Sequence, residues 1–286
     1  MKGINEMNIK ITADSTCDLS PELVEKYNID ILPLYIIKDG TAYKDMKDIV
    51  PEDIFTHVAS GGAITTTSAI NVDDYTEYFR PLSEQYDAVI HINISAEFSS
   101  CNQNANIAAE EFDNVYVIDS RNLSTGSGHV VVEAAIMAQN GATPEEIADA
   151  MKTLVNKVEA SFVVDKLDYL RKGGRCSALA ALGANILSLR PCIEVRNGKM
   201  GVGKKYRGKF DACIEKYVTE RLEGRTDIVT DRIFITHTPC DKKIVDAVRK
   251  TIKKHMQFTE IIETNAGCTV SSHCGPNTLG ILFIRK

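Results

Sequence analysis

The sequence predicts an α/β protein of two domains. The chain has 286 residues, a length that suits two domains. Residues 1–157 alternate apolar strand segments with helical ones, which is typical of a three-layer domain whose parallel sheet is covered by helices on both faces. Residues 158–286 mix hairpins and helices, which favours a smaller domain with a mixed sheet.

The first half carries four strand signals and six helix signals. The strands are expected at Ile9–Ala13, Ile31–Ile37, Ala88–Ile94 and Val115–Asp119. Helices are expected from Pro21 with Ser20 as N-cap, from Pro51, from Val72 to Arg80 with Asn71 as N-cap, from Gln103 to Glu110, from Ser127 to Gln139, and from Thr143 to Val158. Thr143 and Glu146 form a capping box at the start of the last one. Gly126-Ser127-Gly128 lies too far from a strand to be a dinucleotide fingerprint.

Hydroxyl groups gather at two of these helix entrances. One is Thr65-Thr66-Thr67-Ser68 before Asn71, and the other holds Ser95, Ser99 and Ser100 after the third strand. The start of a helix leaves backbone N–H groups unpaired and carries partial positive charge, so it suits an anion. Simple helix capping by serine explains the same pattern. If both entrances lie at the C-terminal edge of one parallel sheet, they face one crevice.

The second half has a different order of predicted strands and helices. Strands are expected at Ala160–Val164, Arg232–Thr236, Glu260–Glu263 and Leu279–Ile284, with helices over Ser177–Leu189, Phe210–Leu222 and Ile244–Ile252. Asn197-Gly198 is a strong turn signal and predicts a hairpin between Ile193–Val195 and Met200–Val202.

Composition narrows the function classes. The net charge of −6 and the pI near 5.6 argue against a nucleic-acid binder. No apolar stretch approaches the ~20 residues of a membrane span, and the N-terminus lacks the apolar core of a signal peptide, so we expect a cytoplasmic protein. The eight cysteines form no CxxC pair and are expected to be free thiols. Cys268, His273 and Cys274 make a poor tetrahedral site, so neither a metal nor a cofactor is expected.

Five motifs, in order, resemble those of the DegV family. They are Asp14-Ser15-Thr16-Cys17-Asp18-Leu19, Thr67-Ser68, the Ser95/Ser99 turn, Leu167-Asp168-Tyr169-Leu170-Arg171-Lys172-Gly173-Gly174-Arg175, and His273-Cys274-Gly275-Pro276-Asn277-Thr278-Leu279-Gly280. They span essentially the whole chain, and the fourth and fifth are the specific ones. The chain departs from the family pattern at Ala69-Ile70-Asn71 and at Glu97-Phe98.

The resemblance implies a lipid-binding protein. A long-chain fatty acid would lie between the domains, with its carboxylate held by Thr67 and Ser99 and with Ser95 and Ser68 close by. Arg171 and His273 would sit at the mouth, near the head group or a separate fatty-acid kinase that makes acyl phosphate. Arg207 belongs to a basic cluster that is a candidate for docking this kinase or the product. The protein itself would have no activity, and transient contact with a membrane surface is compatible with this role.

The alternative is a stand-alone enzyme, a serine hydrolase or transferase acting on a small anionic or lipid substrate in the crevice. Ser99 would then pair with His91 or His273, and with Asp14 or Asp119. The sequence has neither a GxSxG elbow nor a GxxxxGK[ST] phosphate loop, which favours the carrier. The acyl chain, the kinase and the oligomeric state stay open.

Overall fold

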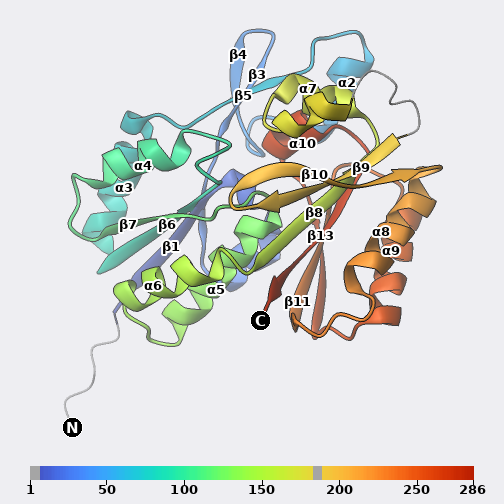
Figure 1. Cartoon of the computed structure of the whole chain (residues 1–286). Coiled ribbons are helices and arrows are strands. Elements are labelled where there is room, and N and C mark those ends of the chain that lie inside the picture. The colour runs from blue at the N-terminus through green and yellow to red at the C-terminus, as the bar shows by residue number, and fades with distance from the viewer. Residues whose placement is uncertain (1–6, 183–188) are drawn as a thin grey trace.

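A four-stranded parallel sheet forms the centre of the N-terminal half (Figure 1). The computed structural model describes residues 7–182 and 189–286. The sheet has the order β2-β1-β6-β7 and consists of β2 (Asp30–Leu32), β1 (Ile9–Asp14), β6 (Ala88–Asn93) and β7 (Val115–Asp119). Ala13 of β1 pairs with Ile31 on one side and with Ile92 on the other. The predicted parallel sheet is therefore confirmed.

Helices cover both faces of this sheet, as predicted for a three-layer arrangement (Figure 1). One face carries α3 (Val72–Gln85) and α4 (Cys101–Ala109), and the other carries α5 (Thr125–Gln139) and α6 (Pro144–Leu154). Alternation along the strands sorts the side chains. Ile90 and Ile92 pack with α5 and α6, whereas the His91 ring between them contacts Tyr75 and Phe79 of α3.

A six-stranded mixed sheet forms the centre of the C-terminal half. Its order is β10-β9-β8-β13-β11-β12, with β10 (Lys199–Arg207), β9 (Leu189–Arg196), β8 (Val158–Val164), β13 (Thr278–Arg285), β11 (Ile228–His237) and β12 (Glu260–Asn265). Strands β11 and β12 run parallel, and the other neighbours run antiparallel. The helices α8 (Phe210–Leu222) and α9 (Lys242–His255) pack on one face of this sheet (Figure 1).

Helix α5 lies between the two sheets and packs against strands of both. Ten of its fifteen residues are buried. Gly126 and Gly128 permit close approach, since a Cβ at Gly126 would lie 2.1 Å from Asn122 Oδ1 and one at Gly128 would lie 2.8 Å from the Cys17 carbonyl. The ring of His129 extends to the mixed sheet, where Nε2 lies 3.0 Å from the Leu282 carbonyl oxygen. The glycines at the start of α5 therefore serve packing.

A small antiparallel sheet corrects two predictions. It has the order β4-β3-β5, formed by β4 (Thr41–Lys44), β3 (Tyr35–Lys38) and β5 (Thr66–Ser68), and lies near α2 (Pro51–Ala59) (Figure 1). The single strand predicted over Ile31–Ile37 is wrong, because it breaks at Pro33, which lacks the N–H needed to continue a ladder. The hydroxyl segment at Thr67 was expected in a loop at the edge of the parallel sheet, and it forms β5 of this small sheet instead.

Most of the predicted caps and turns are confirmed, and one predicted helix is too long. Asn71 caps α3, Thr143 and Glu146 form a capping box on α6, and a tight turn with positive φ at Asn197 and Gly198 joins β9 to β10. The last helix of the first half ends at Leu154 rather than at Val158, which begins β8.

The predicted α-helix over Ser177–Leu189 is wrong in its described part. Ser177–Leu182 form a 3₁₀ helix (η2), residue 189 begins β9, and residues 183–188 lie outside the described part. The other short elements are the 3₁₀ helix η1 (Ser15–Cys17) and the helices α1 (Pro21–Lys26), α7 (Leu167–Gly173) and α10 (Cys268–Cys274). No helix in the described ranges is both long enough and apolar enough to cross a membrane.

Candidate functional site

A cavity of about 360 Å³ lies where β5, α4, α10 and β10 come together. This volume falls within the usual range of small-molecule sites. Its polar lining comes from Thr67, Ser68, Asn71, Ser99, Ser100, Asn104, Arg175, Thr269 and His273. Its apolar lining comes from Leu34, Ala69, Ile94, Phe98, Leu123, Met200, Val270 and Cys274. The site therefore offers hydroxyl and amide groups together with an aliphatic wall, which suits an amphipathic ligand.

Thr67 and His273 form a hydrogen-bonded pair in the polar lining. Thr67 Oγ1 lies 2.8 Å from His273 Nε2, and the buried Nδ1 of the same ring has no hydrogen-bond partner among the described residues. A buried N–H without a partner is rarer than a buried lone pair, so the proton is better placed on Nε2, which then donates to Thr67. In this tautomer the Thr67 hydroxyl keeps its own hydrogen for a ligand.

His273 is neutral in the folded protein at neutral pH. Burial, followed by the positive charge of Arg175, lowers the pKa of His273 to about 4. A neutral imidazole fixes the direction of the Thr67 hydroxyl without adding a charge to the site.

Glycines allow α7 and α10 to pack closely against each other beside His273. A Cβ added to Gly173 would lie 2.2 Å from Nδ1 of His273, and one added to Gly275 would lie 2.7 Å from the Tyr169 ring. Gly275 also has a φ of +75°, which glycine adopts without strain. The two motifs that single out the family resemblance therefore pack directly against each other and position the His273 ring.

A buried carboxylate at Asp45 holds the start of α10. Its Oδ1 accepts from the backbone N–H of Cys268 at 2.8 Å, and its Oδ2 accepts from the N–H of Thr269 at 3.1 Å, the Thr269 hydroxyl at 2.6 Å and the Ser15 hydroxyl at 2.9 Å. These bonds satisfy N–H groups that a helix start leaves unpaired. Asp45 thus ties the short helix that carries His273 to the small sheet.

The aspartates of the first motif are structural as well. Asp14 accepts from the N–H of Ile94 at 2.7 Å and from the Thr16 hydroxyl, and it thereby fixes the turn that leads to Ser99. Asp18 accepts from the Ser124 hydroxyl at 2.5 Å and from the N–H of Gly267 at 2.8 Å. Burial raises the pKa of Asp14 to about 6 and that of Asp18 to about 8.

The start of α4 supplies the second polar edge of the cavity. The Ser99 hydroxyl lies 3.1 Å from Cys101 Sγ and accepts from the Cys101 N–H at 3.3 Å. Ser100 occupies the N-cap position without a side-chain cap bond. Asn104, one turn into the helix, donates to the Ile70 carbonyl at 2.7 Å and joins α4 to the segment after β5. Both predicted hydroxyl entrances therefore meet at one cavity, although they come from different sheets.

Three of the predicted site residues lie elsewhere. Ser95 is fully buried and donates to the Gly198 carbonyl at 2.8 Å, so it holds the β9–β10 hairpin and does not line the cavity. Arg171 is exposed on α7, and Arg207 is exposed at the end of β10. Neither arginine lines the cavity, whereas His273, expected beside them at the mouth, lies against Thr67.

Sequence reasoning did not single out Arg175, Asn104 and Thr269 as site residues, although all three line the cavity. Arg175 ends the LDYLRKGGR motif, which was a usable signal. Asn104 and Thr269 are ordinary helix residues whose position depends on the tertiary fold.

The groups that would form a hydrolase triad are not joined in the described part of the chain. Ser99 bonds to Cys101, while Nδ1 of the buried His91 lies 2.7 Å from Thr12 Oγ1. Asp119 accepts from the backbone N–H groups of Ala96 and Arg121. No hydrogen bond joins Ser99 to a histidine there, so the geometry does not provide an activated serine.

A small cavity of about 20 Å³ adjoins the first one toward the mixed sheet and shares Leu123, Val270 and Cys274 with it. Beyond these residues its lining is mixed. The apolar side chains are Ala160, Phe162, Ala266 and Leu282, and the polar ones are Ser124, Thr236, His237, Thr238 and Thr278. The apolar end of a ligand that runs from Thr67 along Leu123 and Val270 would therefore point toward the mixed sheet.

Comparisons with known proteins agree with this architecture. A family model described as an uncharacterised protein of the DegV family matches residues 8–286. A DegV domain-containing protein of Caldanaerobacter subterraneus subsp. tengcongensis is 32% identical, with 97% of this chain and 99% of the relative covered. A protein of Thermotoga maritima named fatty acid-binding protein is 32% identical, with 96% of each chain covered.

Solved structures show the same likeness. A structure described as fatty acid binding of a DegV family protein from Thermus thermophilus superposes with a TM-score of 0.89 at 29% identity, covering 98% of this chain and 100% of that one. DegV of Bacillus subtilis, described as a fatty acid binding protein, gives a TM-score of 0.82 at 25% identity, with 98% and 100% covered. The family model, the relatives and the shared two-sheet architecture lead to one conclusion: the chain belongs to the DegV family.

Proposed function

We propose that the protein binds a long-chain fatty acid in the 360 Å³ cavity. The observation that carries this proposal is a single cavity whose lining combines hydroxyl groups, those of Thr67 and Ser99 among them, with apolar side chains such as Leu34, Ile94 and Val270. The names of the Thermotoga maritima and Thermus thermophilus relatives support it. Each buried methylene contributes about 0.8 kcal/mol, so an acyl tail gives tight binding without any chemistry.

In this proposal Thr67 and Ser99 hold the carboxylate, and Ser68 lies beside them. A buried carboxylate needs hydrogen-bond donors, since otherwise it takes up a proton. The Thr67 hydroxyl is directed by His273, and the Ser99 hydroxyl lies at the positive end of α4. The role of His273 changes accordingly, from a residue at the mouth to one that positions Thr67.

Mass spectrometry of the purified protein tests ligand binding. Native spectra should show about one acyl chain per molecule, as expected for one site of this size. Thr67→Ala or Ser99→Ala should weaken fatty-acid binding roughly ten- to a hundredfold, because each removes a hydrogen bond to a charged group worth ~1.5–3 kcal/mol. Thr76→Ala changes a half-buried threonine on α3 outside the cavity, and this matched control should bind normally. Absence of lipid, together with failure to take up added fatty acid, would sink the proposal.

We further propose that the protein presents the bound acid to a separate kinase, uses no cofactor and has no activity of its own. The exposed arginines Arg171 and Arg207 are candidates for the docking surface of an acidic partner. Arg207→Glu should then lower acyl-phosphate formation with the partner kinase and leave fatty-acid affinity unchanged. Lys254→Glu on α9 is the control for charge reversal. Ester hydrolysis or ATP consumption by the purified protein alone would favour the enzyme alternative.

A further inference from the structure

A separate, larger cavity of about 460 Å³ lies beside β8 and β9 and shares no lining residue with the 360 Å³ cavity proposed to bind the fatty acid. Its lining includes the five arginines Arg121, Arg196, Arg221, Arg225 and Arg285. The carboxylates among the lining residues are Glu159 and Glu194, so five positive charges face two negative ones and leave a formal excess of three. This concentration of positive charge is found in a chain whose net charge is −6.

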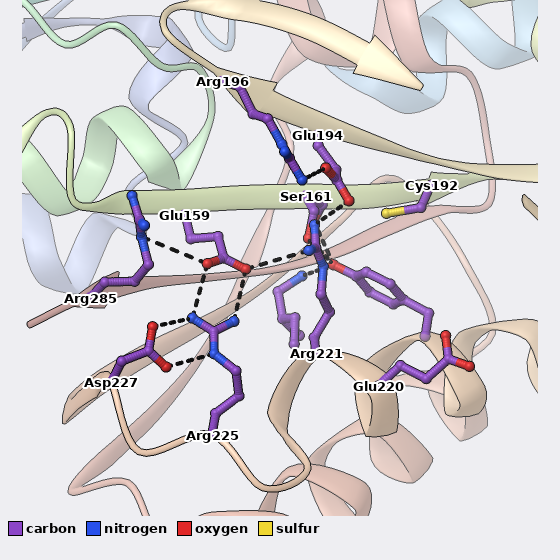
Figure 2. A network of polar contacts seen from close by, with 12 residues as sticks. Glu159, Ser161, Cys192, Glu194, Arg196, Glu220, Arg221, Arg225, Asp227 and Arg285 are labelled. Atoms are coloured by element: carbon purple, nitrogen blue, oxygen red, sulfur yellow. Dashed lines mark hydrogen bonds and ion pairs between the residues drawn. The ribbon is translucent and has the colours of Figure 1, made fainter. Parts of the chain in front are cut away.

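The two glutamates are shared among four of these arginines (Figure 2). Glu159 lies 3.1 Å from Arg225, 3.5 Å from Arg221 and 3.8 Å from Arg285. Glu194 lies 2.6 Å from Arg196 and 3.1 Å from Arg221. On the far side of Arg225, Asp227 adds one more carboxylate at 2.7 Å. Even with Asp227 included, the arginines outnumber the carboxylates by two.

Arg121 is the arginine that these carboxylates do not reach. Arg121 follows β7 and has a φ of +50°. It comes from the N-terminal half of the chain, whereas the other four arginines come from the C-terminal half. Its Nε is buried and has no hydrogen-bond partner in the described part of the chain. A buried guanidinium nitrogen without an acceptor is costly, so a ligand that accepts from it would be favoured.

We propose that this cavity binds a small polyanion that carries two or more phosphate groups. Guanidinium groups pair with phosphate oxygens bidentately, and several arginines around one cavity are the usual means of holding more than one phosphate. The apolar part of the lining consists of the small side chains Val155, Val158, Ala160 and Val195, with no aromatic ring for a base to stack on. The chemistry recognised is therefore the phosphate chain, free or carried by a nucleotide.

The competing explanation is that the arginines and glutamates only stabilise the fold. A structural network of this kind is expected to balance its buried charges, because surplus buried charge costs desolvation energy that no partner offsets. Arg196 and Arg285 are exposed and do not enter this balance, but the buried Nε of Arg121 has no hydrogen-bond partner among the described residues. This nitrogen and the cavity volume both favour a ligand. The two explanations differ in what they predict for Glu194→Gln. If the cavity binds an anion, removal of this carboxylate should tighten that binding, since it frees Arg196 and Arg221. If the network is only structural, the substitution should only lower the stability of the fold.

Isothermal titration of the full-length protein with tripolyphosphate, without divalent cations and at about 150 mM salt, tests the proposal. We expect saturable binding with a Kd below about 1 mM. Arg121→Gln and Arg196→Gln should each weaken it roughly ten- to a hundredfold, as loss of a charged hydrogen bond does. Arg80→Gln is the matched control, because Arg80 is an exposed arginine on α3 that is ion-paired to Glu111 and lies outside the cavity.

Parallel titrations distinguish the source of the phosphates. Equal affinity for tripolyphosphate and ATP means that the phosphates alone are recognised, and tighter ATP binding means that a nucleotide is the natural carrier. Citrate that binds as tightly as tripolyphosphate would overturn the assignment to phosphate. Absence of saturable binding, or equal losses in Arg80→Gln and Arg121→Gln, would overturn the site itself. Unchanged melting temperatures in these variants show that a loss of binding is not a loss of folding.

Discussion

Replacement of Asp45 by asparagine tests how α10, and with it His273, is held in place. Asp45 is buried and accepts four hydrogen bonds from Ser15, Cys268 and Thr269. Asparagine has nearly the same shape but keeps only one acceptor oxygen. With that oxygen in the position of Oδ2, three bonds survive without the charge, and the new NH₂ group faces the Cys268 N–H.

The structure gives the size of the effect. A hydrogen bond to a charged group contributes ~1.5–3 kcal/mol, so loss of the Cys268 bond and weakening of the other three should cost about 2–4 kcal/mol. For a chain of this size each kcal/mol lowers the melting temperature by roughly 2–4 °C, which gives a decrease of about 5–15 °C. Fatty-acid binding should weaken as well, because the start of the helix that carries His273 is loosened.

The assay is urea unfolding at neutral pH, with thermal melting as a second measurement. Asp241→Asn is the matched control. Asp241 caps α9 by accepting from the Lys243 N–H at 2.9 Å, and asparagine caps a helix as well as aspartate does. This control should change the free energy of unfolding by less than about 0.5 kcal/mol. If Asp45→Asn costs no more than Asp241→Asn, the explanation of α10 as a helix held by a distant carboxylate is wrong.

Two further substitutions test the site and the buried acids. Gly173→Ala should displace the His273 ring, cost ~1–3 kcal/mol in the free energy of unfolding and weaken fatty-acid binding, whereas Gly201→Ala, with no atom within 4 Å of the added Cβ, should do neither. The raised pKa of Asp18, about 8, means that the folded state binds this proton more tightly than the unfolded state, so its stabilisation is complete below about pH 4 and is lost as the pH rises through 8. Between pH 6.5 and 8 the free energy of unfolding should therefore fall by up to about 1.4 kcal/mol per pH unit. Histidines with lowered pKa values, such as His273, do not change the free energy of unfolding with pH in this range. Asp18→Asn should remove this slope in urea midpoints measured across that range, and an unchanged slope would contradict the assignment to Asp18.

Local signals in the sequence predicted most of the elements, because caps and apolar periodicity act within a few residues. Asn71 and the pair Thr143 and Glu146 are examples that the structure confirms. Helix α10 was missed because its residues, Cys268–Cys274, are rich in Thr, Val and Ser, which are poor helix formers. Its first N–H groups are held by Asp45, more than 200 residues away, and no local pattern reports such a partner.

The site was predicted only in part for the same reason. The hydroxyls of Thr67 and Ser99 were recognisable as candidates, and both line the cavity. Ser95 resembles Ser99 in sequence, but its hydroxyl is directed to the carbonyl of Gly198, a contact between residues 103 positions apart. The pairing of Thr67 with His273 joins residues 206 positions apart, so their shared role depends on the tertiary fold.

The position of α5 has a consequence for how a ligand enters and leaves. Since this helix packs against both sheets, a hinge motion between the two halves would expose apolar surface of α5 to water. The cost rises by about 25 cal/mol for each Å² exposed, so such opening is rare. Strand β5, which lines the cavity, has three residues and none of them is buried. We therefore expect the residence time of a bound ligand to be set by local opening of β5, with faster amide exchange there than in α5.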